Sequence, residues 1–273
     1  MYNTRIPILL FSYICIIMLG IWWASPVNPK VDKQEICRYV HNVQSDTAEY
    51  AKLLQRLANH RIVLLGEQTH FDGGTFTYKE RLMRNLYERC GYDVILYEAS
   101  MYDMWFVDKE VPLDPLNGLY YFWCNNHESR LLWKFYEDSR RSERPIVLGG
   151  FDVQYTGNIS DSLRFKRLEA YLNTKSIDIR KYTDFVRLHS HIRYLFMSPD
   201  ILDSLQITRL LCDIDRMAMD VKNRMETDNS MDILYYKYLQ GLKGYLEVCG
   251  RYGPGKTCRM ELRDSLMADN FKW

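Results

Sequence analysis

The stretch from Arg61 to Ser100 constrains the fold most, because it has the pattern of a strand, a helix and a second strand. Ile62–Leu65 is a short apolar run, typical of a strand that is buried on both faces. Thr75–Cys90 has helical periodicity, and Gly91 supplies a stop signal after it. Val94–Tyr97 is again strand-like. The pattern predicts two parallel strands joined by a right-handed crossover.

Polar side chains follow the predicted strands at the points where the strands end. A third short strand is predicted at Pro145–Gly150, so that three strands in succession have this feature. The side chains concerned are Glu67, His70, Glu98, Asp152 and Gln154. The carboxyl ends of parallel strands share one edge of a sheet, and open α/β sheets bind ligands at that edge. We therefore expect these side chains to form a site, with the aromatic-rich loop after Glu98 lying over it.

The predicted fold class is α/β, with a parallel-sheet core, a helical insertion and the C-terminal part of the core missing. Helical periodicity with almost no β-branched runs predicts the insertion. The predicted organisation is a signal-anchor and linker at 1–33, the α/β core at 34–156, the helical insertion at 157–257 and a return to the core at 258–273.

The charge balance and the cysteines exclude some classes of function. Lys and Arg together number 36 and Asp and Glu 35, so the net charge near +1 gives no reason to expect a nucleic-acid partner. The seven cysteines form no CxxC pair, which argues against a structural zinc site and a disulfide framework. We expect no cofactor and no bound metal.

The N-terminus contains an uncharged apolar run of 19 residues, Ile6–Ala24, with Arg5 just before it. A run of this length can just span a bilayer core of roughly 30 Å. Cleavage after Ala24 or Ser25 would put a Trp where a signal peptidase requires a small residue. The run therefore predicts an uncleaved signal-anchor, with the membrane as a partner and a membrane-anchored or exported location.

The chemical groups also allow structural interpretations. His70 with Glu67 three residues earlier suits a general base and its orienting carboxylate, although a lone histidine is more often structural. Glu98 is alternatively a structural carboxylate paired with Lys79 or Arg81. Asp152 and Gln154 alternatively cap the turn that follows them. The sequence has no GxSxG motif and so gives no support to a Ser-His-Asp hydrolase. Three carboxylates and a histidine could also hold a divalent ion.

Four segments together resemble the erythromycin esterase family. They are LLGEQTHFDGGTF, GYDVILYEASMYDM, GGFDVQ and RDSLMADNFKW, and they follow one another in the family's order from Arg61 to the last residue. The resemblance implies an α/β core interrupted by a helical insertion. It also implies hydrolysis of a macrocyclic lactone ester by activated water without a required metal. Antibiotic resistance is one role that would follow, although many members of the family have no established substrate.

The resemblance also implies roles for individual residues. His70 would be the general base, and Glu67 and Glu98 would orient it or the water. Lys79, which stands where many members have Arg, keeps the charge but loses the bidentate fork. The residues implied to contact the small-molecule ester substrate are Lys79, Asp152, Gln154 and Arg263. Phe71 replaces the glycine that usually follows the motif histidine, so the turn there is expected to differ.

The chain departs from the family after the last motif. In the family a strand with a second active-site histidine follows, whereas here only ten residues follow Arg263 and every histidine lies at or before His191. The expectation is the front part of a longer enzyme, with impaired activity. The alternative is a non-catalytic or haem- or metal-binding protein of the same core fold, with His70 or the pair His189 and His191 as ligands.

Overall fold

The computed structural model describes residues 48–66, 72–110, 115–157, 161–251 and 257–272. The chain divides into two compact units, residues 1–56 and 57–273. Helix α3 (Ala48–Leu57) comes from the first unit and ends at the boundary. The other described elements belong to the second unit.

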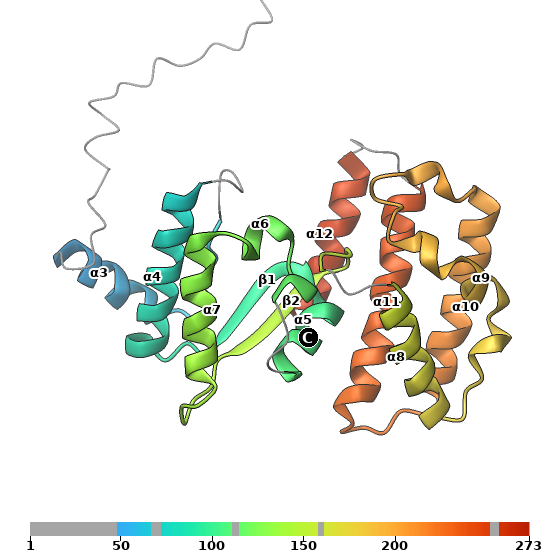
Figure 1. The fold of residues 1–273 in the computed structure, drawn as a ribbon, viewed down its shortest axis with the longest axis horizontal. Coiled ribbons are helices and arrows are strands. Elements are labelled where there is room, and N and C mark those ends of the chain that lie inside the picture. The colour runs from blue at the N-terminus through green and yellow to red at the C-terminus, as the bar shows by residue number, and fades with distance from the viewer. Residues whose placement is uncertain (1–47, 67–71, 111–114, 158–160, 252–256, 273) are drawn as a thin grey trace, which may run out of the picture. The chain divides into compact units, whose positions relative to one another are not determined.

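The second unit is mostly helical (Figure 1). Its elements in chain order are α4 (Gly73–Cys90), β1 (Val94–Ser100), α5 (Met101–Lys109), η1 (Pro115–Asn117), α6 (Tyr121–Cys124), α7 (His127–Ser139), β2 (Val147–Asp152), α8 (Asp161–Thr174), η2 (Ile179–Lys181), α9 (Thr183–Ile192), η3 (Pro199–Ile201), α10 (Ser204–Lys222), α11 (Ser230–Arg251) and α12 (Thr257–Phe271).

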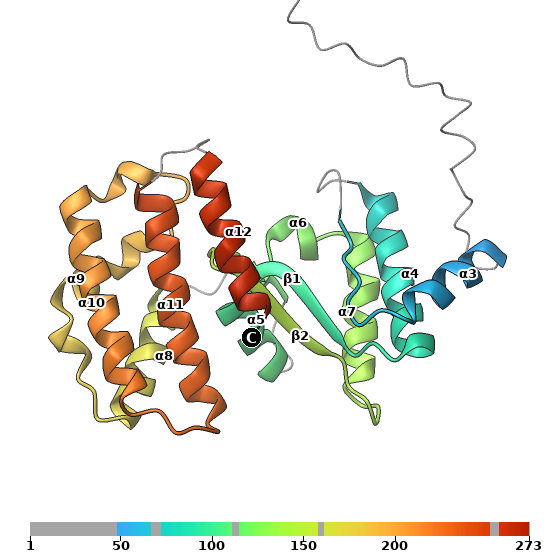
Figure 2. The same cartoon turned by 180° about the vertical axis from the view of Figure 1, so that it is seen from behind.

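Strands β1 and β2 pair in parallel, with Val94 opposite Val147. One face of this pair packs against a core that includes Phe135 of α7. Helices α4 and α7 stand together on one side of the strands, and α8 to α11 stand on the other side (Figures 1 and 2). The strand pair therefore lies between two groups of helices.

Helices α8 to α11 share a second and larger core. Leu168, Leu210, Ile214 and Leu239 have no exposed surface in it. Tyr102 of α5 belongs to the same core, so the short helix that follows β1 joins the strands to the helical region. The helical character of this stretch was predicted from its periodicity and is confirmed. The predicted domain boundaries stay a prediction.

Local signals explain where α4 begins and ends. The side chain of Asp72 caps the helix by accepting a hydrogen bond from the Thr75 N–H at 3.3 Å. At the other end Gly91 has a left-handed φ of 82°, and its N–H donates to the carbonyl of Leu86. Glycine tolerates this conformation at little cost, so the predicted stop at Gly91 is confirmed.

The predicted fold class is wrong. Over the described residues the sheet has only two strands, and helices make up most of the chain, so there is no extended parallel-sheet core. The predicted first strand at Ile62–Leu65 is irregular, with Ile62 57% and Leu64 84% exposed. An apolar run becomes a strand only where a neighbouring backbone pairs with it, and this segment has no strand pairing. The two later strands are confirmed as a parallel pair.

The membrane prediction also needs correction. Across the described ranges, no helix has the length and apolar character needed to cross a bilayer. This finding contradicts the predicted signal-anchor, the membrane as a partner and the membrane-anchored or exported location. Ile6–Ala24, on which the prediction was based, lies outside the described residues.

Candidate functional site

The carboxyl ends of β1 and β2 bring two carboxylates to one edge of the strand pair. The side chain of Glu98, near the end of β1, is 44% exposed. Asp152, the last residue of β2, is buried. Parallel pairing puts both strand ends at the same edge, so the sequence correctly predicted that these residues would lie near each other.

Arg263 of α12 joins the two carboxylates. Its Nη2 lies 2.6 Å from Oε1 of Glu98 and 2.5 Å from Oδ2 of Asp152, and its Nε donates to Oδ1 of Asp152 at 3.3 Å. Glu98 is 165 residues away in sequence. The two contacts with Asp152 have the paired geometry that favours Arg over Lys. Glu98 therefore pairs with Arg263 rather than with Lys79 or Arg81, the partners considered from the sequence.

Two contacts between α12 and β2 hold Arg263 in place. The side-chain amide of Asn270 donates to the carbonyl of Phe151 at 3.1 Å, and the ring of Phe271 meets that of Phe151 edge-on. Burial disfavours the charge on Arg263, but hydrogen bonds and attraction from Asp152 and Glu98 outweigh burial and raise its pKa. The guanidinium thus stays charged while it contacts both carboxylates.

Gln154 and Tyr120 extend the site. The Tyr120 hydroxyl donates to Oε1 of Gln154 at 2.5 Å, and the Gln154 N–H donates to Oδ1 of Asp152 at 3.2 Å. Burial, followed by the charge of Asp152, raises the pKa of Tyr120, so its hydroxyl remains a donor. The sequence analysis missed Tyr120 as an individual residue. Its only sequence signal is its place in the aromatic-rich loop, which was expected to lie over this edge.

Lys79 lies in an aromatic environment. It is buried on α4, with its Nζ 5.8 Å from the centroid of the Phe76 ring and 5.7 Å from that of Trp123. The Trp123 ring also contacts Tyr97 of β1 edge-on, at 5.9 Å between centroids. The role of Lys79 in substrate binding stays a prediction.

Glu67 and His70 lie outside the described residues, together with Phe71. Their roles as orienting carboxylate and general base therefore stay predictions. The described residues that contact one another at the strand ends are Glu98, Asp152, Gln154 and Arg263, to which the structure adds Tyr120.

Two of the histidines considered as metal or haem ligands, His189 and His191, lie on α9. His189 stacks on Phe165 with 4.2 Å between ring centroids, and its Nδ1 is 3.0 Å from the carbonyl of Val186. Nδ1 of His191 contacts Ser190 at 3.5 Å. Within the described part of the chain, no group of three or more His, Cys, Asp or Glu side chains could hold a metal ion. The described residues thus offer no observation in favour of the binding alternative, and the role of His70 as a ligand stays a prediction.

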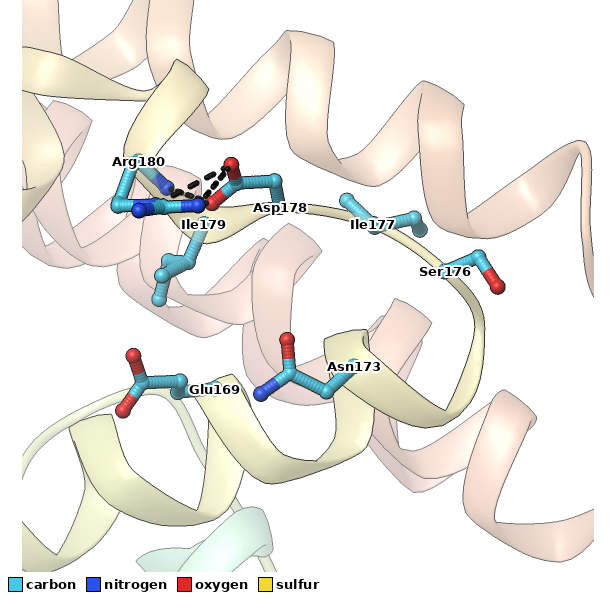
Figure 3. Close-up of a pocket in the computed structure, with 7 residues that line it drawn as sticks. All are labelled: Glu169, Asn173, Ser176, Ile177, Asp178, Ile179 and Arg180. Carbon is cyan, nitrogen blue, oxygen red and sulfur yellow. Dashed lines mark hydrogen bonds and ion pairs between the residues drawn. The ribbon is translucent and has the colours of Figure 1, made fainter.

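Two cavities differ in their relation to the strand ends. The larger, about 460 Å³, lies on the surface between α8 and η2 (Figure 3). It is lined by Glu169, Asn173, Ser176, Ile177, Asp178, Ile179 and Arg180. All of these come from one short stretch of chain, and Asp178 and Arg180 already pair with each other. The smaller cavity, about 20 Å³, lies beside Asp152. Position therefore favours the strand ends as the functional site.

Comparisons with known proteins place the chain near a hydrolase. No protein-family profile matches the sequence. The chain is 31% identical over 107 residues to the Bacillus subtilis (strain 168) protein named "Putative hydrolase YbfO". The match covers 37% of this chain and 24% of that protein. It is consistent with a hydrolase at most, and it does not show the erythromycin esterase family.

Two crystal structures share the fold. One is described as a succinoglycan biosynthesis protein, with 16% identity, and the other is a Bacillus cereus protein, with 17% identity. Each has a TM-score of 0.61 and a match that covers 86% of this chain and 59% of the solved one. The chain thus matches less than two thirds of these proteins. At such low identity the likeness shows the fold alone.

Proposed function

We propose that this protein is a hydrolase that cleaves carboxylic esters, including macrocyclic lactones, with water as the nucleophile. The observation that carries the proposal is the convergence of Glu98 and Asp152 on Arg263, at the carboxyl edge of two parallel strands. Ligands commonly bind at this edge of parallel strands. The partial similarity to a hydrolase and the four sequence motifs support the same class of reaction.

In the proposed reaction His70 is the general base. It takes a proton from a water molecule while the water oxygen adds to the ester carbonyl carbon. The bond from that carbon to the alcohol oxygen then breaks, and the proton passes to the leaving alcohol. General-base assistance of this kind typically contributes about 10² to 10⁴-fold. Glu67 would orient the imidazole or the water.

The described residues suit the supporting roles. Glu98 is partly exposed and is paired with Arg263, so a negative carboxylate is available at the surface of the site. A carboxylate beside an imidazole fixes its tautomer and raises its basicity. Arg263 is a positioning residue in this scheme, because it acts through Glu98. Buried Asp152 in turn fixes the guanidinium of Arg263. Gln154 and Lys79 would contact the substrate.

The first experiment tests the reaction and its base. Mass spectrometry would follow hydrolysis of a macrolide panel and of simple aryl esters by the wild type and by His70→Ala. We expect turnover of at least one ester and a loss of about 10² to 10⁴-fold in His70→Ala. Equal rates for the two proteins would remove His70 from the mechanism, and no hydrolysis by the wild type would remove the proposal.

The second experiment tests the carboxylate pair. Arg263→Lys keeps the charge but loses the paired geometry, so we expect kcat to fall on the order of 10-fold or more with a smaller change in KM. Arg259→Lys is the control, because Arg259 is the other arginine on α12, and its buried guanidinium lies over Phe196, away from the two carboxylates. Circular dichroism would check that both variants are folded. If folded Arg263→Lys has the kcat of the wild type, the ion pairs of Arg263 have only a structural role.

A further inference from the structure

Ester hydrolysis by water requires a hydrogen-bond donor for the carbonyl oxygen as well as a base for the water. When the water oxygen adds to the carbonyl carbon, the electron pair of the C=O double bond moves to the carbonyl oxygen, which becomes an oxyanion. A donor placed at this oxygen lowers the barrier, because it stabilises a charge that the bound ester does not yet carry. Such a donor should lie beside the strand-end carboxylates and should have no other partner.

Gln154 has a side-chain amide nitrogen that meets both conditions. The residue is buried directly after β2, and its backbone N–H donates to Oδ1 of Asp152 at 3.2 Å. Its side-chain Nε2 donates to none of the residues that the structure describes. This nitrogen is nevertheless not one of the fully enclosed polar atoms that lack a partner, so it keeps some accessible surface. Two N–H donors of Gln154 are therefore available to a ligand.

Tyr120 determines which way this amide points. Its hydroxyl donates to Oε1 of Gln154 at 2.5 Å, and burial raises the pKa of Tyr120, so the hydroxyl keeps its proton at neutral pH. An amide has its acceptor on one side and its two donors on the other. The bond from Tyr120 to Oε1 therefore turns Nε2 away from the hydroxyl. The Tyr120 ring in turn stacks on Phe122, with 5.2 Å between ring centroids.

The charges around Tyr120 place the pair of Tyr120 and Gln154 at the proposed site. Asp152, Arg263 and Glu98 all act on the Tyr120 hydroxyl through their charges, so they lie close to it. Two hydrogen bonds from Arg263 already balance the carboxylate of Asp152, at 2.5 and 3.3 Å. The amide of Gln154 thus lies beside an ion pair and not beside an unbalanced negative charge, which would oppose an oxyanion.

We propose that Gln154 donates the hydrogen bond to the oxyanion and that Tyr120 is the positioning residue of Gln154. One N–H of Nε2 contacts the carbonyl oxygen while water adds to the carbonyl carbon. When the intermediate collapses, the C=O double bond forms again, the bond to the alcohol oxygen breaks, and the negative charge leaves the carbonyl oxygen. This inference rests on the proposed ester hydrolysis, and it gives Gln154 a role in the transition state beyond contact with the bound ester.

The first test removes only the hydroxyl that orients the amide. Tyr120→Phe keeps the ring that stacks on Phe122, and its kinetics would be measured on the ester that the wild type hydrolyses fastest. We expect kcat to fall on the order of 10-fold or more, with KM nearly unchanged, because the donor acts on a charge that the bound ester lacks. Tyr121→Phe is the matched control. Tyr121 is the next residue on α6 and is 67% exposed, so this variant should keep the wild-type kcat and KM.

The second test asks whether Tyr120 acts through Gln154. Gln154→Met keeps the length of the side chain but has no N–H donor, so kcat should fall about 10² to 10³-fold, as for other oxyanion donors. In the double variant Tyr120→Phe/Gln154→Met, kcat should be no lower than in Gln154→Met, because Tyr120 has no amide left to orient. A phosphonate analogue of the same ester mimics the tetrahedral anion. Its inhibition constant should rise across the variants by the factor by which kcat/KM falls.

Different results would overturn different parts of the scheme. Wild-type kcat in Tyr120→Phe, or a double variant in which the two losses multiply, would overturn the positioning role of Tyr120. Wild-type kcat in folded Gln154→Met would overturn the role of Gln154. Either result leaves ester hydrolysis itself in place, whereas a wild type that hydrolyses no ester removes both proposals. If Gln154→Met fails to fold, the kinetics of Tyr120→Phe and its inhibition by the phosphonate decide the question alone.

Discussion

The helical region of α8 to α11 and the strand pair differ in how completely they are buried. In the helical region, apolar side chains such as Leu210 and Leu239 have no exposed surface. In the strand pair one face is packed, but on the other Val94 is 51%, Leu96 40% and Val147 42% exposed. The same chain thus contains a closed core and a partly open one.

The difference teaches how the candidate site is held in place. Helices can bury their apolar faces against one another through contacts that are mostly local in sequence, whereas two strands alone leave a face and both edges to be covered. In the strand region, ion pairs and hydrogen bonds from α12 fix Glu98 and Asp152. The proposed chemistry therefore lies in the region where polar contacts replace close packing.

The largest expected effect tests the junction between the two regions. Arg164→Met would leave Asp103, which has no exposed surface, without its partner. Loss of one partner of a buried pair typically costs about 3 to 5 kcal/mol. Lys134→Met is the control, since Lys134 and Asp138 pair on the exposed surface and the expected cost is about 0 to 1 kcal/mol. Urea unfolding would measure the free energy of unfolding of both variants. Equal losses in the two would mean that the pair of Asp103 and Arg164 contributes little to stability.

The second prediction compares the two cores directly. Leu239→Ala should cost about 2 to 5 kcal/mol, because the side chain is fully buried among helices. Leu96→Ala on the open face should cost clearly less, because that side chain already contacts water. Urea unfolding at several protein concentrations measures both changes. A cost for Leu96→Ala as large as that for Leu239→Ala would show that this face is covered in solution.

The third prediction uses pH to separate two buried aspartates. Burial raises the pKa of Asp103 to about 6 and outweighs the attraction of Arg164. The folded state then holds this proton more tightly than the unfolded state, so the contribution of Asp103 to stability falls as pH rises from about 4 to about 6.

For Asp232, burial acts in the same direction, but hydrogen bonds from the Glu226 N–H, Lys175 and Tyr171 outweigh it and lower the pKa. Its contribution is present above about pH 4 and is lost on acidification.

The measurement compares each protein with its asparagine variant. Urea unfolding from pH 3 to pH 7 gives the stability difference between the wild type and Asp103→Asn, and between the wild type and Asp232→Asn. The first difference should fall with rising pH by about 3 kcal/mol. The second should rise from pH 3 and then level off. Parallel curves for the two variants would contradict the opposite pKa directions.

The sequence predicted the helices and the meeting of Glu98 with Asp152, because periodicity and parallel strand ends are local or topological signals. It failed at Ile62–Leu65, because an apolar run does not reveal whether a neighbouring strand will pair with it. The contact of Arg263 with both carboxylates also lay beyond pattern reading. It depends on how α12 packs against β2, more than 100 residues away in sequence.

The smallest expected effect concerns one glycine in each region. Gly91 has a left-handed φ of 82°, so Gly91→Ala strains the end of α4 and should cost about 1 kcal/mol. Gly241 lies inside α11, and an added Cβ would meet its nearest atom, Cγ1 of Val153, at 3.9 Å, which is ordinary contact. Gly241→Ala should therefore stabilise the protein by about 0.5 to 1 kcal/mol, because alanine loses less backbone entropy in a helix. Thermal and urea unfolding would measure both variants. Destabilisation by Gly241→Ala would mean that the helical region is packed too tightly there for one methyl group. An unchanged stability of Gly91→Ala would mean that the end of α4 adjusts without strain.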